Sequence, residues 1–299
     1  MPAAGRFLGL DAGGSATRFV VCDGDGGLLR RGALAPVSGH LYRPEVRAGF
    51  VAALAPLAGV GFDGAVAGIT GLTGDAKEAS EAADILSERL AIRRTAIRVE
   101  DDLWVGYHAA FRPGEGHAVY AGTGSVGLHV GRDGGMLRVG GRGMLIDDGG
   151  SAFWIGREGL NLLYRRVDGG EDGGPLGAAL FGAIGARDWN TVRAHVYRDG
   201  RNNVAQLARA VAAAGDADAG ALAILRGAGA ELARLAQALV ARAGPLPVAL
   251  LGRAAALHPV ILQGFTASCP GLAVSMPQTD PALAAARLAA CSARRARAG

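Results

Sequence analysis

Two apolar runs flank an aspartate and a pair of glycines in LGLDAGGSATRFVVCD, residues 8–23. Apolar runs on either side of a Gly-Gly turn predict two antiparallel strands joined by a tight loop. Glycines let backbone N–H groups approach a ligand closely, and consecutive N–H groups form a concave anion site. A carboxylate at the strand end, here Asp11, supplies the oxygen ligand that a hydrated Mg²⁺ needs. The stretch therefore predicts a phosphate and magnesium loop, and a glycine hairpin without a ligand is the alternative.

The composition is that of a folded protein with two domains of ordinary size. Of the 299 residues, 50% are hydrophobic and 19% are charged, which is too apolar for a disordered chain. The 49 glycines indicate many tight turns and closely packed helices. The net charge of +4 owes much to Arg294, Arg295 and Arg297. Because no basic stripe with interleaved aromatic residues occurs, nucleic-acid binding is a poor interpretation.

The cysteines and the hydropathy of the sequence exclude several further classes of protein. The three cysteines, Cys22, Cys269 and Cys291, are scattered and form no Cys-x-x-Cys pair. This pattern supports neither a disulfide framework nor a metal or iron–sulfur site. There is no basic and apolar leader at the N-terminus, and no uninterrupted apolar window of about 18 residues. We expect a cytoplasmic protein that has no membrane partner.

Apolar periodicity predicts three successive strands, followed by alternating strands and helices, in the first part of the chain. Strands are expected over 6–10, 17–22, 28–35, 65–69 and 95–99, and helices over 44–57, 76–90 and 103–111. This order gives an α/β layout, a mixed sheet with helices on its faces. Ligands of such sheets bind at the carboxyl ends of strands, and Asp11, Thr70 and Asp102 all stand at such ends.

The same arrangement begins again after the turn-rich segment 112–116. Strands are expected over 118–121, 126–130 and 136–139, and a second glycine turn, GTGS, lies at 122–125. Two glycine hairpins from two domains would hold one polyphosphate from opposite sides. We therefore predict two domains, residues 1–115 and 116–299.

The rest of the chain is largely helical. Helices are expected over 152–165, 176–184, 189–196, 203–213, 217–242, 259–267 and 281–295, and strands over 248–251 and 272–275. Ser151 is a suitable N-cap, and Asp147 and Asp148 precede it in a glycine loop. Adjacent aspartates there are costly unless something is bound or hydrogen-bonded, and the alternative is a solvated acidic turn that favours the helix N-terminus. The apolar strand that reaches Gly252 is either a nucleotide contact or an ordinary strand end.

Five motifs, in order, resemble those of the N-acetylglucosamine kinase and glucosamine kinase group, within the BadF/BadG/BcrA/BcrD ATPase-like family of the actin-like ASKHA superfamily. They are GLDAGGSAT at 9–17, VEDD at 99–102, AGTGS at 121–125, GGRG at 140–143 with DGGSA at 148–152, and LLG at 250–252 with GD at 215–216. The resemblance covers nearly the whole chain. It implies an α/β, two-lobed actin-like ATPase (ribonuclease H-like) fold, each lobe having a mixed sheet of a three-strand meander plus strand–helix units. The last helix, about 281–295, would pack back on the N-terminal lobe.

The resemblance also implies an activity, an ATP-dependent carbohydrate kinase that phosphorylates a hydroxyl of N-acetylglucosamine or glucosamine. Asp11 would organise Mg²⁺ through water, and Asp102 would be the general base that takes the proton of the sugar hydroxyl. Such transfers depend on positioning and on charge neutralisation. Asp101 stands where relatives commonly carry Asn, so Asp102 is the preferred base.

By the same resemblance, the remaining site residues fall into two sets, and the protein would be a homodimer. The residues expected at ATP are Gly13, Gly14, Ser15, Thr17, Gly122, Thr123, Gly124, Ser125, Gly215, Gly252 and Arg253. The residues expected at the sugar are Ser38, His40, Thr70, Asp102, Gly141, Arg142 and Asp148.

Three departures from the pattern of this group leave the identity of the sugar open. Ser38-Gly39-His40 stands in place of Ser-x-Asn, Gly141-Arg142 in place of the Gly-Trp of animal kinases, and Gly149 in place of an acidic or amide residue. His40 would donate to a sugar hydroxyl or be a surface residue. Arg142 would favour an anionic or carbonyl-bearing substrate or pair with Asp147.

Two other functions fit the same fold. An ATPase that activates a partner dehydratase or reductase would hold a [4Fe–4S] cluster between two subunits by paired cysteines, and the scattered cysteines disfavour it. A non-catalytic sugar or nucleotide sensor is disfavoured by the presence of Asp11, Asp102 and both glycine turns.

Overall fold

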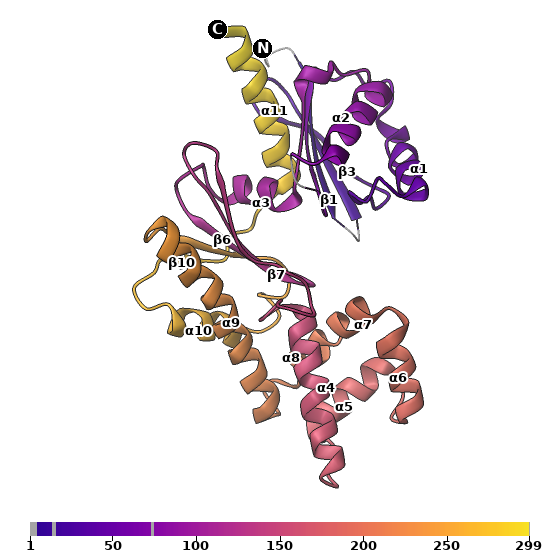
Figure 1. Ribbon diagram of the computed structural model, residues 1–299, viewed down its shortest axis with the longest axis vertical. Coiled ribbons are helices and arrows are strands. Elements are labelled where there is room, and N and C mark those ends of the chain that lie inside the picture. The colour runs from indigo at the N-terminus through magenta and orange to yellow at the C-terminus, as the bar shows by residue number, and fades with distance from the viewer. Residues whose placement is uncertain (1–4, 14–15, 73–74, 299) are drawn as a thin grey trace. The chain divides into compact units, whose positions relative to one another are not determined.

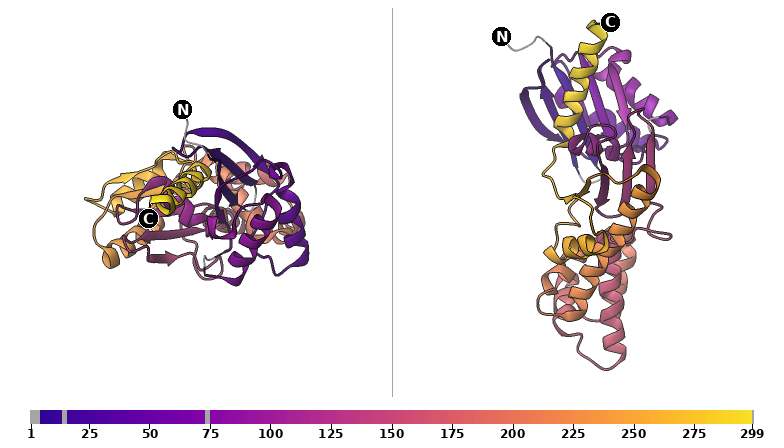
Figure 2. Two further views of the ribbon diagram at one scale, coloured as in Figure 1. Left: turned by 90° about the horizontal axis from the view of Figure 1, so that it is seen from above. Right: turned by 90° about the vertical axis from the view of Figure 1, so that its left-hand side faces the viewer.

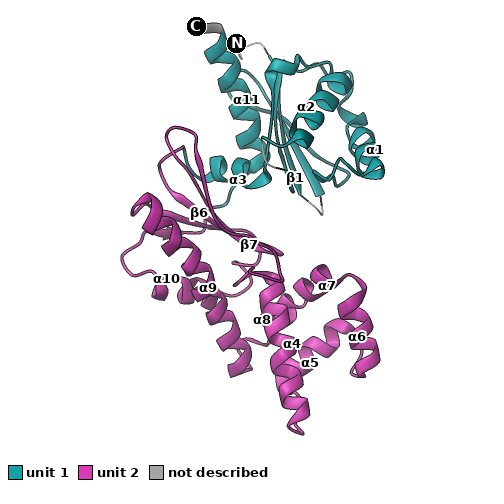
Figure 3. Ribbon diagram, in the orientation of Figure 1, with its two compact units in different colours: residues 1–112, 278–299 teal, residues 113–277 magenta. Residues whose placement is uncertain are grey.

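The computed structural model describes residues 5–13, 16–72 and 75–298. The chain divides into two units, residues 1–112 with 278–299 and residues 113–277 (Figure 3). The first boundary lies close to the predicted one, and the C-terminal segment belongs to the first unit. None of the described helices combines the length and apolar character that crossing a bilayer requires.

The first unit is built on a mixed five-stranded sheet in the order β3-β2-β1-β4-β5 (Figure 1). Its strands are β1 (Phe7–Gly13), β2 (Ala16–Cys22), β3 (Leu28–Leu34), β4 (Gly64–Ile69) and β5 (Ile97–Glu100). The first three strands form an antiparallel meander, and β4 and β5 run parallel to β1. Pairing of β1 with β2 continues to the turn, Gly13 opposite Ala16, so β1 extends past Asp11 instead of ending before it.

Helices cover both faces of this sheet. They are α1 (Pro44–Ala53), α2 (Lys77–Leu90), α3 (Asp102–Ala110) and α11 (Pro281–Ala298), with short 3₁₀ helices Ala55–Leu57 and Arg94–Ala96. Side chains of β1 alternate between the faces. Leu8, Leu10 and Ala12 are buried in one core with residues of α1 and α2, whereas α11 packs on β1, β2 and β4 from the other face (Figures 1 and 2).

The second unit repeats the sheet design, in the order β10-β9-β6-β7-β8. Its strands are β6 (His117–Ala121), β7 (Ser125–Val130), β8 (Met136–Gly140), β9 (Val248–Leu251) and β10 (Val274–Ser275). The strands β6, β7 and β8 form the antiparallel meander, and β9 and β10 continue the sheet in parallel. The predicted repeat of a three-strand meander with strand–helix units is therefore confirmed.

The helices of the second unit are α4 (Ala152–Asp168), α5 (Gly174–Ile184), α6 (Trp189–Arg198), α7 (Gly200–Gln206), α8 (Ala208–Ala214), α9 (Ala219–Ala243) and α10 (Pro259–Ser268). Ser151 caps α4 as predicted, because its hydroxyl oxygen accepts from the Trp154 amide at 3.1 Å. Glycine permits the close packing of α9 on α10. A Cβ at Gly229 would overlap the carbonyl oxygen of Ile261, and one at Gly264 would overlap that of Arg226.

Besides β1, several predicted elements differ from the observed ones, and the strand expected over 272–275 spans only Val274–Ser275. The helix expected over 44–57 ends at Ala53 and is followed by the 3₁₀ helix Ala55–Leu57, because Pro56 has no N–H to donate to the carbonyl four residues before it. The strand expected over 95–99 starts only at Ile97, after a 3₁₀ turn. The helix expected over 203–213 consists of α7 and α8, which are separated at Leu207, and no residue type in the sequence marks this interruption.

Candidate functional site

In the first unit, Asp11 stands near the end of the central strand β1. It lies opposite Arg18 of β2, and its Oδ2 atom is 3.5 Å from Nη1 of that residue. The Asp11 side chain is 17% exposed. Burial raises the pKa of this carboxyl, while the Arg18 guanidinium acts in the opposite direction. Asp11 is thus a partly desolvated carboxyl, and the cation beside it in the described part of the chain, Arg18, makes a long contact.

Thr70, directly after β4, connects three predicted segments. Its amide donates to the carbonyl of Ala12 at 2.9 Å, and its own carbonyl accepts from the amide of Gly39 at 3.0 Å. Its side chain also hydrogen-bonds to Asp102. Thr70 therefore lies against the end of β1, against the loop around Gly39 and against the candidate base.

Asp101 and Asp102 have different roles at the start of α3. Asp101 is the N-cap, and its Oδ1 accepts from the Leu103 amide at 2.7 Å. Asp102 is the first helical residue, and burial raises the pKa of its carboxyl to about 8. A hydrogen bond to Asp101 and the charges of Asp101 and Asp11 act in the same direction, and the bond from Thr70 opposes them. Asp102 is therefore the carboxyl whose protonation changes near neutral pH.

The small residue Gly68 of β4 allows α3 to start this close to the sheet. A Cβ at this position would lie 2.7 Å from Cγ2 of Val105 and 3.1 Å from Cα of Asp102. Real Cβ atoms do not approach other atoms so closely, so α3 would have to move. The position of Asp102 beside the ends of β1 and β4 thus depends on a glycine in the neighbouring strand.

The loop that follows β3 brings two predicted sugar residues to the same end of the sheet. The amide of His40 faces the hydroxyl of Ser38 at 3.4 Å. A Cβ at Gly71, directly after Thr70, would lie 3.4 Å from Cε1 of His40. The first unit therefore brings Ser38, His40 and Thr70 together, with His40 exposed to solvent.

The first glycine turn is only partly described. Gly14 and Ser15 lie outside the described residues, Gly13 ends β1, and Thr17 is buried in β2. The Thr17 hydroxyl oxygen is shielded from solvent and has no hydrogen-bond partner among the described residues. A buried hydroxyl without a partner costs free energy, so this group is an energetic liability within the described part of the turn.

The second glycine turn, residues 122–125, lies between β6 and β7 and is held by the N-terminal end of α4. The carbonyl of Gly122 accepts from the Ala152 amide at 2.9 Å, and that of Thr123 from the Phe153 amide at 3.3 Å. The Ser125 hydroxyl donates to the carbonyl of Gly149 at 2.7 Å. Within the described residues no partner takes the amides of Thr123 and Gly124. Two unpaired amides in a fixed turn suit an anion.

Asp148 lies beneath this turn and is almost fully enclosed. Its side chain is 2% exposed, and its backbone has a left-handed φ of 70°, which is rare for a residue other than glycine. Oδ1 accepts from the Ser125 amide at 3.2 Å, and Oδ2 accepts from Nη2 of Arg201 at 2.9 Å. The sequence predicts contacts from Asp148 to a sugar, whereas the described contacts of its carboxylate are with the turn and with Arg201.

Sequence reasoning missed Arg201. This residue stands at the start of α7, far along the chain from Asp148, in a segment without a recognisable motif. Its guanidinium lies directly on the second turn, since a Cβ at Gly124 would overlap Nη2 of Arg201 and approach Oδ1 of Asp148 to 2.7 Å. Only the folded helices bring this cation to the turn.

The loop that follows β9 also lies against the second glycine turn. Gly252 has a φ of 95°, and a Cβ there would overlap the carbonyl oxygen of Ala121, the last residue before the second turn. The Ala254 amide donates to that carbonyl at 2.9 Å. Gly252 is thus next to the turn, while the side chain of Arg253 is exposed.

The predicted nucleotide residue Gly215 also lies near this loop. Its Cβ position would be 3.2 Å from Cδ2 of His258. Nε2 of His258 lies 3.2 Å from Oδ1 of Asp216, and Nδ1 accepts from the Val260 amide at 3.2 Å. One tautomer, protonated on Nε2, satisfies both contacts. His258 therefore connects the segment of Gly215 and Asp216 to the loop after β9.

Gly141 and Arg142 follow β8 at the edge of the sheet. Gly141 has a φ of 65°, its Cβ would lie 2.9 Å from Cβ of Val126, and its carbonyl accepts from Nη2 of Arg138 at 3.3 Å. Gly141 is thus close to the residue that follows the second turn. The side chain of Arg142 is exposed.

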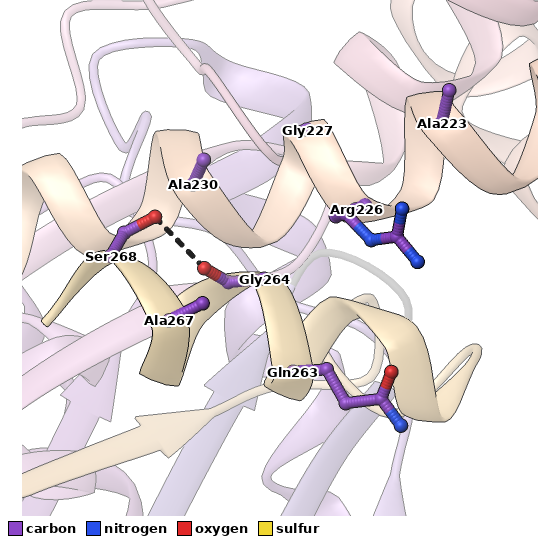
Figure 4. A pocket seen from close by; sticks show the side chains of 8 residues that line it. All are labelled: Ala223, Arg226, Gly227, Ala230, Gln263, Gly264, Ala267 and Ser268. Carbon is purple, nitrogen blue, oxygen red and sulfur yellow. Dashed lines mark hydrogen bonds between the residues drawn. The ribbon is translucent and has the colours of Figure 1, made fainter. Parts of the chain in front are cut away.

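A cavity of about 520 Å³ lies elsewhere, between α9 and α10 (Figure 4). Small side chains and the polar Arg226, Gln263 and Ser268 line it. None of the predicted site residues contributes to it, so its position gives no support to any of the predicted binding roles.

The donor sets fit the groups that the predicted reaction requires. Mg²⁺ prefers oxygen ligands and is usually held by one or two carboxylates together with substrate phosphates. Asp11 supplies such a carboxylate, and it lies close enough to the candidate base for its charge to raise the pKa of Asp102. No group of three ligating side chains occurs in the part of the chain that is described. The unpaired amides of the second turn fit a phosphate group.

The cysteines are placed as structural residues. Cys22 and Cys269 are buried, and Cys291 is half-buried. Burial raises the pKa of the Cys22 thiol to about 11 and raises that of Cys269. Both thiols therefore stay protonated at neutral pH, whereas a metal ligand must be a thiolate.

Two mixed five-stranded sheets, each with a three-strand antiparallel meander continued by parallel strands, are the design of the actin-like α/β class. The sequence matches the BadF/BadG/BcrA/BcrD ATPase family over residues 8–281. Because this match covers most of the chain, the protein belongs to that family. No curated protein matches the sequence significantly.

Solved structures with the same fold cover almost the whole chain. A candidate N-acetylglucosamine kinase from Chromobacterium violaceum is 25% identical, with a TM-score of 0.73 over 96% of this chain and 100% of its own. A candidate N-acetylglucosamine kinase from Porphyromonas gingivalis is 17% identical, with a TM-score of 0.74 over 96% and 99% of the two chains. A ROK family glucokinase from Streptomyces griseus, in complex with glucose and AMPPNP, is 15% identical, with a TM-score of 0.59 over 97% and 100%.

Proposed function

We propose that the protein is an ATP-dependent kinase that transfers the γ-phosphoryl group of ATP to a hydroxyl of an amino sugar, N-acetylglucosamine or glucosamine. Asp102 carries the proposal. It is a half-buried carboxyl beside the ends of two parallel strands, its pKa is raised to about 8, and Thr70 and Asp101 hydrogen-bond to it. A general base works best when its pKa lies near the operating pH.

The two units supply different groups for this reaction. In the first unit, Asp102 accepts the proton of the attacking hydroxyl on its carboxylate, while Ser38, His40 and Thr70 bind the other hydroxyls of the sugar. In the second unit, the amides of Thr123 and Gly124 bind phosphate. Phosphoryl transfer depends mainly on such positioning and on charge stabilisation.

Asp11 is the residue that would hold Mg²⁺ through water. When bound, the metal neutralises phosphate charge and favours the ionised form of the neighbouring carboxyls. The Asp11 side chain is partly exposed, and among the described residues its ion pair is a long contact with Arg18, which supports this role. The carboxylate of Asp148 contacts the second turn. We also propose that Asp148 hydrogen-bonds to the sugar, as the resemblance implies.

The structural relatives support the substrate class. The Chromobacterium violaceum protein, at 25% identity over nearly the full length of both chains, is described as a candidate N-acetylglucosamine kinase. The departures at His40 and Arg142 leave the choice between acetylated and free amino sugar to experiment. A homodimer in the cytoplasm, with the two predicted domains as lobes, completes the proposal, and light scattering tests its oligomeric state.

A coupled ADP-release assay over amino sugars, N-acetylated hexosamines and plain hexoses tests the proposed activity. We expect ADP release above the background ATPase rate with N-acetylglucosamine or glucosamine, and a sugar phosphate as product in mass spectrometry. ATP hydrolysis that no sugar stimulates would contradict the kinase and favour an ATPase that serves a partner protein.

A further inference from the structure

Two arginine–aspartate pairs of the second unit differ in their geometry. Arg166 and Asp218 form a bidentate pair, with Nη1 to Oδ2 at 2.6 Å and Nη2 to Oδ1 at 2.9 Å. Their side chains are 21% and 2% exposed, and Asp218 also caps α9. Both terminal nitrogens of the guanidinium donate to the carboxylate, one to each oxygen. This bidentate geometry is expected of a pair that joins helices.

The pair of Arg201 and Asp148 is built differently. A single bond joins it, from Nη2 to Oδ2 at 2.9 Å. The Arg201 side chain is 42% exposed although that of Asp148 is only 2% exposed. Its Nε atom is shielded from solvent and has no hydrogen-bond partner among the described residues. An arginine has five N–H donors, so this guanidinium keeps donors that the pair does not use.

The guanidinium lies beside a turn that already favours an anion. Its Nη2 atom, which donates to Asp148, would overlap a Cβ at Gly124, so the group stands next to the unpaired amides of Thr123 and Gly124. Asp148 fixes the geometry from below, because its second oxygen accepts from the Ser125 amide at 3.2 Å. A planar guanidinium held at a turn of free amides matches the geometry of a phosphate group.

We propose that Arg201 binds a phosphate of the nucleotide at the second glycine turn, and that Asp148 is the positioning residue that holds Arg201 there. The proposal deepens the proposed function and rests on it for the identity of the ligand, a nucleoside polyphosphate. Gly124 is required because any side chain at this position would displace the guanidinium. Arg201 thus gives the turn a positive charge that its amides alone lack.

Nucleotide affinity of the full-length chain, measured by calorimetry with Mg·ADP, Mg·AMPPNP and adenosine, tests this proposal. We expect Arg201→Gln to weaken both phosphate-bearing probes by about tenfold or more and to leave adenosine unchanged. Arg201→Lys should recover part of the affinity, because it keeps the charge but not the planar fork. A purely structural role would not distinguish adenosine from ADP.

Arg166→Gln and Arg193→Gln are the matched controls. Arg166→Gln breaks the bidentate pair and should lower the melting temperature without changing phosphate discrimination, and Arg193 is an exposed residue of α6. Wild-type affinity for ADP and AMPPNP in Arg201→Gln overturns the inference, and so does equal weakening of adenosine. If Arg201→Gln loses the phosphate-bearing probes but the wild type phosphorylates no sugar, the inference stands and the proposed function fails. If the wild type binds no nucleotide, both fail.

Discussion

Asp102 combines burial with the charge of nearby carboxyls, and both disfavour its ionised form. In the native state its pKa is raised to about 8, well above the value near 4 of an unfolded chain. Because the native state holds this proton more tightly than the unfolded chain, the Asp102 carboxyl contributes most to stability below the pKa of the unfolded chain. This contribution is lost as the pH rises from that value toward 8. The carboxyl that we propose as the base is thus a source of instability at neutral and alkaline pH.

Asp102→Asn should therefore stabilise the first unit at high pH. The amide cannot ionise, so the variant should melt a few degrees above the wild type at pH 9, and the difference should shrink toward pH 4. Calorimetry at both pH values measures it. A variant that melts below the wild type at pH 9 would show that the Asp102 carboxylate is stabilised in the native state.

The pH dependence of the proposed reaction follows from the same group. The value of kcat/KM reports ionisation in the free enzyme, so it should rise with pH and level off above about 8, the raised pKa of Asp102. The profile of kcat against pH should reach its plateau at a lower pH than that of kcat/KM. The reason is that the positive charge of Mg²⁺ in the substrate complex favours the ionised form of Asp102 and so lowers its pKa. Steady-state rates between pH 5.5 and 9.5 provide the comparison. A flat kcat/KM profile below pH 8 excludes Asp102 as the base.

At the scale of elements, glycine decides how helix α11 meets the sheet of the first unit. A Cβ on Gly9 of β1 would overlap backbone atoms of Ala282 and Ala286 in α11. Backbone atoms cannot rotate out of the way, so Gly9→Ala should lower stability by about 1–3 kcal/mol. Chemical denaturation measures the loss.

Gly49→Ala is the matched control for this substitution. Gly49 is an exposed residue of α1 with no atom near its Cβ position, and alanine in a helix interior is favoured over glycine by about 0.5–1 kcal/mol. The control should therefore become more stable while Gly9→Ala becomes less stable. Equal behaviour of the two variants would mean that α11 does not pack closely on β1.

The sheet of the second unit contains a pair of buried histidines on neighbouring strands. The rings of His117 in β6 and His129 in β7 are 4.9 Å apart between centroids. Burial lowers the pKa of His117, the charge of His129 acts in the same direction, and a bond to the Gly244 carbonyl opposes them. The neutral ring is therefore part of the native sheet.

Acid should destabilise this sheet. Because the native pKa of His117 is lowered, the unfolded chain binds more protons below about pH 6.5, and stability is lost as the pH falls through that value toward the lowered pKa. Denaturant midpoints between pH 7.5 and 5 should fall for the wild type and change less for His117→Gln. The same slope in both proteins would assign the acid sensitivity to other groups.

At the scale of the whole molecule, most of the fold was predictable because the same order of strands and glycine turns occurs twice in the sequence. The meander, the glycine turn and the parallel strand occur in both halves, and the positions of Asp11, Thr70 and Asp102 follow from where strands end. The role of Arg201 was not predictable, since only the packing of α7 in the second unit brings it to Gly124. The enclosure of Asp148 has the same origin, a tertiary contact without a local signal.

The site residues likewise divide into those that the sequence pattern predicts and those that only tertiary packing brings together. Asp101 and Asp102 differ by one position in sequence, and only the helix start separates them, because Asp101 caps α3 and leaves Asp102 to face Thr70. The neighbourhood of Gly252 and Ala121 arises from parallel pairing of β6 with β9, which joins segments far apart in the chain. Motif order predicts which residues matter, and packing decides what each of them touches.

The most direct test of the central claim is the rate of γ-phosphoryl transfer to the amino sugar in Asp102→Asn, with ATP affinity measured on the same protein. Asp84→Asn is the matched control, a surface carboxyl of α2 that pairs with Arg94. Removing a general base costs about 100- to 10 000-fold in rate. We predict a loss of this size in Asp102→Asn, with ATP affinity and folding retained and with Asp84→Asn close to the wild type. A wild-type rate of sugar phosphorylation in Asp102→Asn would contradict the account.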